Sequence, residues 1–253
     1  MTVIHYILIG VAAFLGGAVN ALAGGGTLIT FPMMTAVGIP PVSANVTNTI
    51  ALVPGYFGAT WAQRKDLKDQ RKRMRILLPL SALGGLLGGI LLIRIDESVF
   101  DALVPYLILL ATVLLAVGAP LRKWLVKRGE EKEVADSLEK WAPFPVFLGA
   151  MYGGYFGAGL GVITLAVLGL LYNDSITRLN ALKQSISFAV NTAGAIFFVF
   201  SGRVYWLAAL IMAVFAYAGG TAGGKLAGKV KPQVLRRVIV VIGLIVSVIY
   251  IVK

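Results

Sequence analysis

The sequence predicts an all-α polytopic membrane protein in which about eight membrane elements form two inverted repeats, with the first element of each repeat broken at glycines. Composition is the first observation, because 58% of the residues are hydrophobic and only 13% are charged, about half the share that is usual in soluble domains. The second is a series of apolar runs long enough to cross about 30 Å of hydrocarbon. These lie near 3–23, 42–63, 76–93, 100–118, 143–172, 179–200, 205–224 and 234–252.

The charged residues lie outside these runs. All 11 Asp and Glu residues fall in loops or at segment ends, so the net charge of +12 reflects loops that face the cytoplasm rather than binding of nucleic acid. The chain has no cysteine, which excludes disulfides and thiolate metal sites. A single histidine, His5, cannot form a metal site, and we expect no metal and no cofactor.

The N-terminal run imitates a signal peptide, because its apolar stretch is followed by "ALAG", a small-residue pattern of the Ala-x-Ala type. The basic region that precedes the apolar stretch of a signal peptide is missing. Residues 3–23 are therefore predicted to be the first membrane segment.

A third observation is an internal duplication. Shifting the chain by 135 residues places Gly24 on Gly159 and Asn45 on Asn180, and it also places "GGLLGG" (84–89) on "GGTAGG" (219–224). The same offset at distant motifs indicates two homologous halves. We expect membrane repeats at 1–118 and 143–253, joined by a charged cytoplasmic linker at 119–142.

The basic loops predict how the halves are oriented. Lysine and arginine mark the cytoplasmic side, and they gather at 64–75, 121–140 and 225–237. Eight simple crossings would put the third loop on the side opposite the first two. The conflict disappears if the first element of each half, 3–37 and 143–172, enters the membrane, breaks and returns. Each half then crosses three times, the repeats are inverted, and both termini lie outside.

The breaks are expected at "AGGGTLITFP" (23–32) and "GAGLGVIT" (157–164). Irregular backbone must be buried in protein or line a cavity, and broken helices at equivalent places in two halves point to a transporter's binding site. A helix that starts at Thr27 or Val162 would aim its positive end at a ligand, which favours anions. The alternative is that these glycines only allow close helix packing, the interpretation we prefer for 84–89 and 219–224.

The next element of each half carries a polar stripe at helical spacing. The stripes are Asn45, Asn48, Thr49 and Tyr56 in the first half, and Asn180, Lys183, Gln184, Ser187 and Asn191 in the second. Lys183 lies five residues inside an apolar span, where a charge is costly and usually functional. The alternative is that Lys183 extends to the nearby surface, and Arg178 is interpreted as a topology marker.

Together these motifs resemble the sulfite exporter TauE/SafE family of bacterial membrane proteins, over nearly the whole chain. The resemblance rests on the glycine break followed by "TLITFP", on "SANVTNT", on "GGLLGG", and on a divergent second copy after a charged loop. It implies transport of sulfite, thiosulfate or organosulfonates such as sulfoacetate. By position, the family's motifs fall on Gly24, Gly25, Gly26, Asn45 and Asn48. The second copy departs from them, with Lys183 at the place of Asn48 and Leu160 at that of Gly25.

The leading hypothesis is therefore a multi-pass transporter of the bacterial inner membrane that exports a small sulfur-containing anion, bound near the midplane between the breaks. Its partners are this anion and the lipid bilayer, and a monomer and a homodimer are both open. The candidate binding residues are Gly24, Gly25, Gly26, Thr27, Asn45, Asn48, Gly159, Gly161, Asn180, Lys183 and Gln184. An anion channel and a membrane assembly factor are the alternatives. An enzyme is disfavoured, because the spans offer no general base or nucleophile.

The same lack of carboxylates within the spans bears on energetics. Coupling to protons or sodium commonly uses an intramembrane carboxylate, so we expect uncoupled, electrogenic movement of the anion. Sodium held by carbonyls at the glycine breaks is the alternative. Asp101 and Asp174 are the carboxylates nearest to the spans.

Overall fold

The computed structural model describes the chain except for residues 129–138, 173, 228, 230–232 and 253, and its regular elements are all helical. The first half contains α1 (Val3–Leu22), α2 (Thr27–Ala36), α3 (Pro41–Ala62), the short 3-10 helix η1 (Arg64–Leu67), α4 (Arg71–Arg94) and α5 (Glu97–Arg128). The second half contains η2 (Glu139–Trp141), α7 (Pro143–Tyr155), α8 (Leu160–Leu171), α9 (Ile176–Phe198), α10 (Trp206–Leu226) and α11 (Gln233–Val252). The predicted all-α class is confirmed.

Several helices have the length and composition to cross a membrane. Among the described residues these are α1, α4, α10 and the Glu97–Val117 part of α5. The polar stripes of α3 and α9 lower the hydropathy of those two long helices. α5 continues to Arg128, ten residues beyond the predicted end of the first repeat at 118. Part of the predicted linker at 119–142 is therefore helical, and 129–138 lie outside the described residues.

The predicted breaks are confirmed, since the first element of each half consists of two helices. Gly24 (φ +82°) and its equivalent Gly159 (φ +77°) adopt the left-handed conformation that glycine reaches at little cost, which reverses the chain. α2 begins at Thr27, as predicted. α8 begins at Leu160 rather than at Val162, because Gly159 already completes the turn and the next residue is helical.

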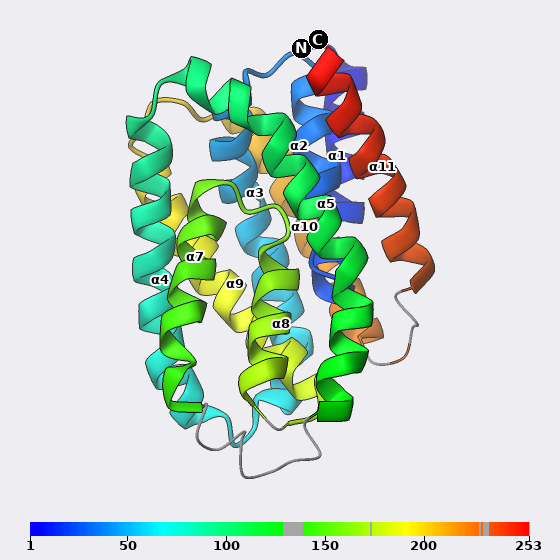
Figure 1. The fold of residues 1–253 in the computed structure, drawn as a ribbon. Coiled ribbons are helices and arrows are strands. Elements are labelled where there is room, and N and C mark those ends of the chain that lie inside the picture. Colours follow the sequence, from blue (N-terminus) through cyan, green and yellow to red (C-terminus); the bar gives the residue numbers. More distant parts are fainter. Residues whose placement is uncertain (129–138, 173, 228, 230–232, 253) are drawn as a thin grey trace.

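The two halves enter the bundle from opposite ends. Figure 1 shows both chain termini at one end, whereas α7 begins at the other end. Their packing is reciprocal, because α1 lies against α10 and α7 lies against α4, and likewise α3 packs on α10 and α9 on α4. This reciprocity supports the predicted inverted arrangement. Which end faces the cytoplasm stays a prediction.

Glycines of α4 and α10 bring the halves into backbone contact. A methyl group at Gly85 would lie 2.5 Å from the carbonyl oxygen of Val190, and one at Gly220 would lie 2.1 Å from that of Gly55. Val190 and Gly55 are themselves separated by the sequence offset, so the two contacts are equivalent. The prediction that the glycines of 84–89 and 219–224 serve helix packing is confirmed at these positions.

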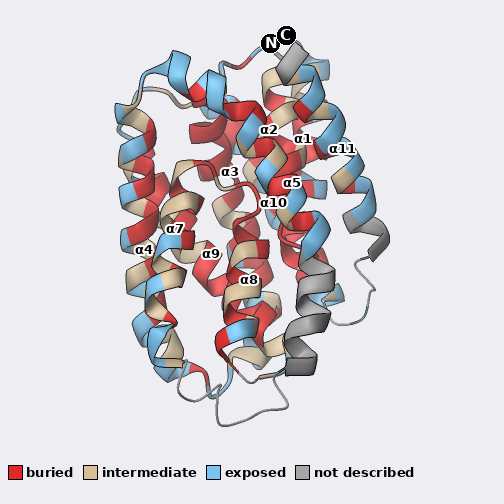
Figure 2. Cartoon of the chain, viewed as in Figure 1, coloured by how far each residue is buried: buried red, intermediate tan, exposed pale blue. Residues whose placement is uncertain are grey.

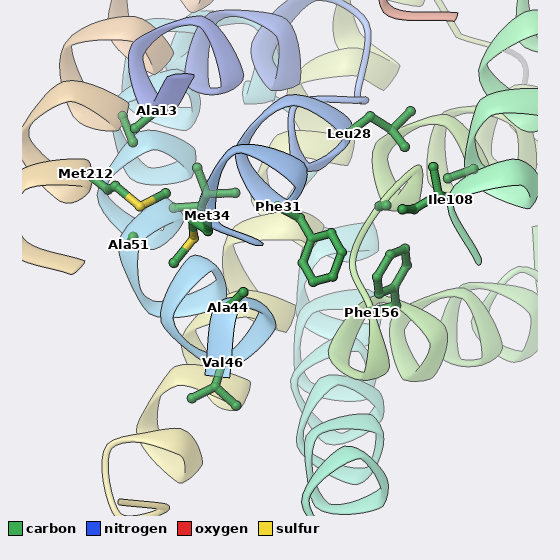
Figure 3. Close-up of a cluster of buried hydrophobic side chains, with 14 of the residues drawn as sticks. Ala13, Leu28, Phe31, Met34, Ala44, Val46, Ala51, Ile108, Phe156 and Met212 are labelled. Atoms are coloured by element: carbon green, nitrogen blue, oxygen red, sulfur yellow. The ribbon is translucent and has the colours of Figure 1, made fainter. Parts of the chain in front are cut away.

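The chain breaks lie within the buried centre of the bundle (Figure 2). In Figure 3, Phe31 of α2 faces Phe156, with ring centroids 5.3 Å apart in an edge-on arrangement. α5 covers the breaks as well, because a methyl group at Gly25 would lie 3.1 Å from Leu115, and one at Gly159 would lie 3.3 Å from Ala111. Protein therefore shields the irregular backbone, as its unpaired amides and carbonyls require in a membrane.

Candidate functional site

The two chain breaks touch at the centre of the molecule. A methyl group at Gly24 would lie 2.7 Å from the carbonyl carbon of Gly161, and one at Gly161 would lie 2.7 Å from the Cα atom of Gly24. These separations leave no room for a side chain at either position. The predicted site residues Gly24 and Gly161 therefore allow the two breaks to meet.

Three predicted residues of α9 gather at the carbonyl end of α1. Nζ of Lys183 and Nε2 of Gln184 both donate to the main-chain oxygen of Asn20, at 2.9 Å and 3.0 Å. Nδ2 of Asn180 donates to the main-chain oxygen of Ala21 at 3.1 Å. The last carbonyls of a helix have no partner within it, so these side chains satisfy acceptors that the break exposes.

Lys183 is buried, with 1% of its surface exposed. The carbonyl end of a helix carries partial negative charge, which stabilises a cation placed there. The ammonium group thus points into the core, and the alternative of a side chain extended to the surface does not describe this structure. Arg178 lies in an ion pair with Asp174 at 2.9 Å, with about a third of its side chain exposed.

Asn20 joins the two sides of the first break. While its main-chain oxygen accepts from Lys183, its side-chain Oδ1 accepts from the main-chain N–H of Gly26 at 2.7 Å. This N–H belongs to the start of α2, where an anion was expected to bind. An anion could use it only after the bond to Asn20 opens.

An equivalent arrangement lies at the carbonyl end of α7. Nδ2 of Asn45, the counterpart of Asn180, donates to the main-chain oxygen of Tyr155 at 2.8 Å. Asn48 stands at the place of Lys183, and its Oδ1 is buried without a hydrogen-bond partner among the described residues, as is Oδ1 of Asn45. The structure therefore forms two related centres, with an ammonium group at one and an amide at the other.

All the predicted site residues are buried, although they do not surround one common point. Around the first centre lie Gly26, Thr27, Asn180, Lys183 and Gln184; around the second lie Asn45 and Asn48; Gly24, Gly25, Gly159 and Gly161 form the breaks between them. Their roles as ligands stay predictions.

Residues 9–250 match the family described as "Sulfite exporter TauE/SafE". The chain belongs to the TauE/SafE family. The family resemblance of the sequence motifs is thereby confirmed, as are membrane location and transport as the class of function.

Similar TauE/SafE relatives are named as transporters. A probable membrane transporter protein ORF9 of Sinorhizobium sp. is 26% identical over 94% of this chain and 89% of its own length. A probable membrane transporter protein YfcA of Escherichia coli K12 is 25% identical, over 95% and 88%. A probable membrane transporter protein of Haemophilus influenzae is 28% identical, over 92% and 89%. No solved structure matches the chain.

Sequence reasoning missed three residues of this candidate site. Asn20 binds both sides of the first break, Oε1 of Gln63 accepts from Asn180 at 2.7 Å, and Tyr155 supplies the carbonyl that Asn45 binds. Asn20 lies one turn before the glycine break, and an amide there is a detectable signal. Gln63 is the last residue of the apolar run 42–63 and was not included in either polar stripe. Tyr155 acts through its backbone, so its side chain gives no signal.

Proposed function

We propose that this TauE/SafE transporter exports a small sulfur-containing anion, such as sulfite or an organosulfonate, across the bacterial inner membrane. The family description supports this substrate class. The names of the relatives support membrane transport and specify no substrate.

The observation that carries the proposal is the buried ammonium group of Lys183 beside the first chain break. A charge in a membrane core is costly unless it is compensated, and it usually marks a substrate pathway. The α1–α3 and α7–α9 segments contain no Asp or Glu within their helices, so a carboxylate from these helices does not neutralise it. A bound anion would place a negative charge beside this ammonium group.

The binding step follows from the internal hydrogen bonds. In this conformation, Nζ of Lys183 and Nε2 of Gln184 both donate to the main-chain oxygen of Asn20. On binding, the anion would replace this oxygen as their hydrogen-bond acceptor. The start of α2 would add main-chain N–H groups and the positive end of a helix. Each donor exchanges an internal hydrogen bond for one to the anion. Selectivity among anions therefore depends on how well the anion's oxygens match several donors at once.

The closed contact between Gly24 and Gly161 favours a transporter over an open channel. Passage between the breaks requires them to separate, which two inverted halves can achieve by rocking against each other. Single-channel recording distinguishes the two modes, because a channel gives discrete currents and a transporter gives slow, saturable flux.

Binding and flux of purified protein test the proposal. We expect sulfite or sulfoacetate to raise the thermal unfolding midpoint in detergent and to move into proteoliposomes with saturable kinetics, because a ligand that binds the folded state stabilises it. An absence of saturable movement for every sulfur oxyanion tested would overturn the proposal.

A further inference from the structure

The two carbonyl ends at the chain breaks differ in charge. At the end of α1, the ammonium group of Lys183 lies 2.9 Å from the main-chain oxygen of Asn20. At the end of α7, the equivalent position belongs to Asn48, which is neutral. Each carbonyl end carries partial negative charge, so both favour a cation. Of the two polar stripes, only that of α9 contains a cation, Lys183, and this cation lies at the end of α1.

Two amide oxygens without partners lie on α3, next to the residue that binds the end of α7. Asn45 and Asn48 are one helical turn apart on α3 and are 1% and 2% exposed. Neither Oδ1 atom has a hydrogen-bond partner in the described part of the chain. The orientation of the Asn45 amide follows from its bond to Tyr155, because the reversed amide would place two oxygens against each other at 2.8 Å.

The chemistry of these groups is that of a cation site. Amide oxygens and the carbonyl end of a broken helix are acceptors only, and such ends coordinate alkali cations in other transporter folds. α3 and α7 contain no charged residue, so no carboxylate of these helices is present to favour a divalent ion, and none of their side chains supplies a positive charge.

We propose that a monovalent alkali cation binds beside Oδ1 of Asn45, Oδ1 of Asn48 and the carbonyl end of α7. Its charge takes the place that the Lys183 ammonium takes in the other half. This site is separate from the anion site and does not depend on the proposed substrate. A bound cation would also allow coupled transport. The expectation of uncoupled transport rested on the lack of carboxylates within the spans and did not consider amide oxygens as ligands.

The first experiment measures thermal unfolding of the detergent-purified protein at constant ionic strength, with no sulfur anion present. Sodium or potassium chloride replaces choline chloride in steps. We expect a saturable rise of the midpoint by at least about 3 °C with Na⁺ or K⁺, since binding to the folded state alone stabilises it. Equal midpoints in Na⁺, K⁺ and choline would overturn the proposal.

Variants locate the site. Asn48→Lys supplies the ammonium group that the second half already has, and we expect it to remove the response to alkali cations. Asn48→Ala removes one ligand, so about a tenfold higher cation concentration should be needed for half the shift. Asn191→Ala is the matched control, because Asn191 is also buried but its Nδ2 bonds within α9, to Ser187. The control should respond as the wild type does.

A wild-type response in both Asn48 variants would also overturn the proposal. If Asn48→Lys does not fold, Asn48→Ala decides the matter alone. Stabilisation by sulfite is measured in choline buffer, so a missing cation site and a missing anion site give different results.

Discussion

Nζ of Lys183 lies 2.9 Å from the main-chain oxygen of Asn20, at the point where α1 breaks and the chain turns back. The contact joins residues that are 163 positions apart in the sequence and belong to different halves. It sets a buried positive charge on the negative end of a helix, next to the start of a second helix. The anion-transport proposal depends on this placement.

The contact between the two breaks predicts the effect of substitutions at Gly24. Gly24→Ala should lower the thermal midpoint more than Gly38→Ala does. Both glycines have positive φ, so each alanine carries a left-handed strain of roughly 1–2 kcal/mol. A methyl group at Gly38 meets open space, whereas one at Gly24 meets the backbone of Gly161. Equal shifts in unfolding experiments would show that the breaks are not tightly packed.

The equivalent contacts of α4 and α10 predict equivalent losses of stability. Gly85→Ala and Gly220→Ala should both destabilise the protein, since each methyl group would meet a carbonyl oxygen at 2.5 Å and 2.1 Å. Leu87→Ala is the control in the same segment, because Leu87 is 41% exposed and should tolerate truncation better. Thermal unfolding of the three variants tests this. A harmless substitution at either glycine would contradict the reciprocal packing.

The ion pairs around Asp174 predict a structural role for this carboxylate. It accepts a hydrogen bond from Arg73 at 2.7 Å and forms an ion pair with Arg178 at 2.9 Å, with its side chain 14% exposed. Asp174→Asn should cost roughly 1–3 kcal/mol of unfolding free energy, as for a hydrogen bond to a charged group. Glu97→Gln, whose partner is Arg203, should cost less than about 1 kcal/mol, because Glu97 is more exposed. Denaturation of both variants compares them, and the reverse order would contradict this assignment.

The predicted topology can be tested by cysteine labelling, since the chain has no cysteine of its own. Thr2, Lys68 and Lys225 are all exposed, so a cysteine at each is open to reagents on its own side. An impermeant thiol reagent added to intact cells should modify Thr2→Cys. Lys68→Cys and Lys225→Cys should react only after the membrane is permeabilised. Labelling of Lys225→Cys from outside would support eight simple crossings and remove the inverted repeat.

The sequence predicts local features of this fold well. Glycines at Gly24 and Gly159 indicated the breaks, because no other residue adopts their conformation so readily, and helical spacing placed the polar stripes on inward faces. The apolar run ends at 118, but α5 continues to Arg128, since lysine and arginine within 121–128 favour helix as much as many apolar residues do.

Long-range partners could not be predicted. The bond from Asn180 to Gln63 and the bond from Asn45 to Tyr155 join residues 117 and 110 positions apart. Composition and spacing fix which face of a helix is polar, but they leave open which backbone atom that face meets. For this reason the sequence assigned Asn45 and Asn180 to a ligand, whereas in this conformation their amides hold the ends of broken helices.

Sulfite flux through Lys183 variants tests the central claim most directly. Wild type, Lys183→Arg, Lys183→Met and the control Asn191→Ala are reconstituted in equal amounts, with equal sodium on both sides and a potassium–valinomycin potential as the driving force. Lys183→Met keeps an apolar stem and loses the charge, so its flux should fall at least about tenfold, equivalent to 1.4 kcal/mol. Lys183→Arg should retain part of the flux, and Asn191→Ala should retain most of it. Folded Lys183→Met protein that moves sulfite at the wild-type rate would contradict the account.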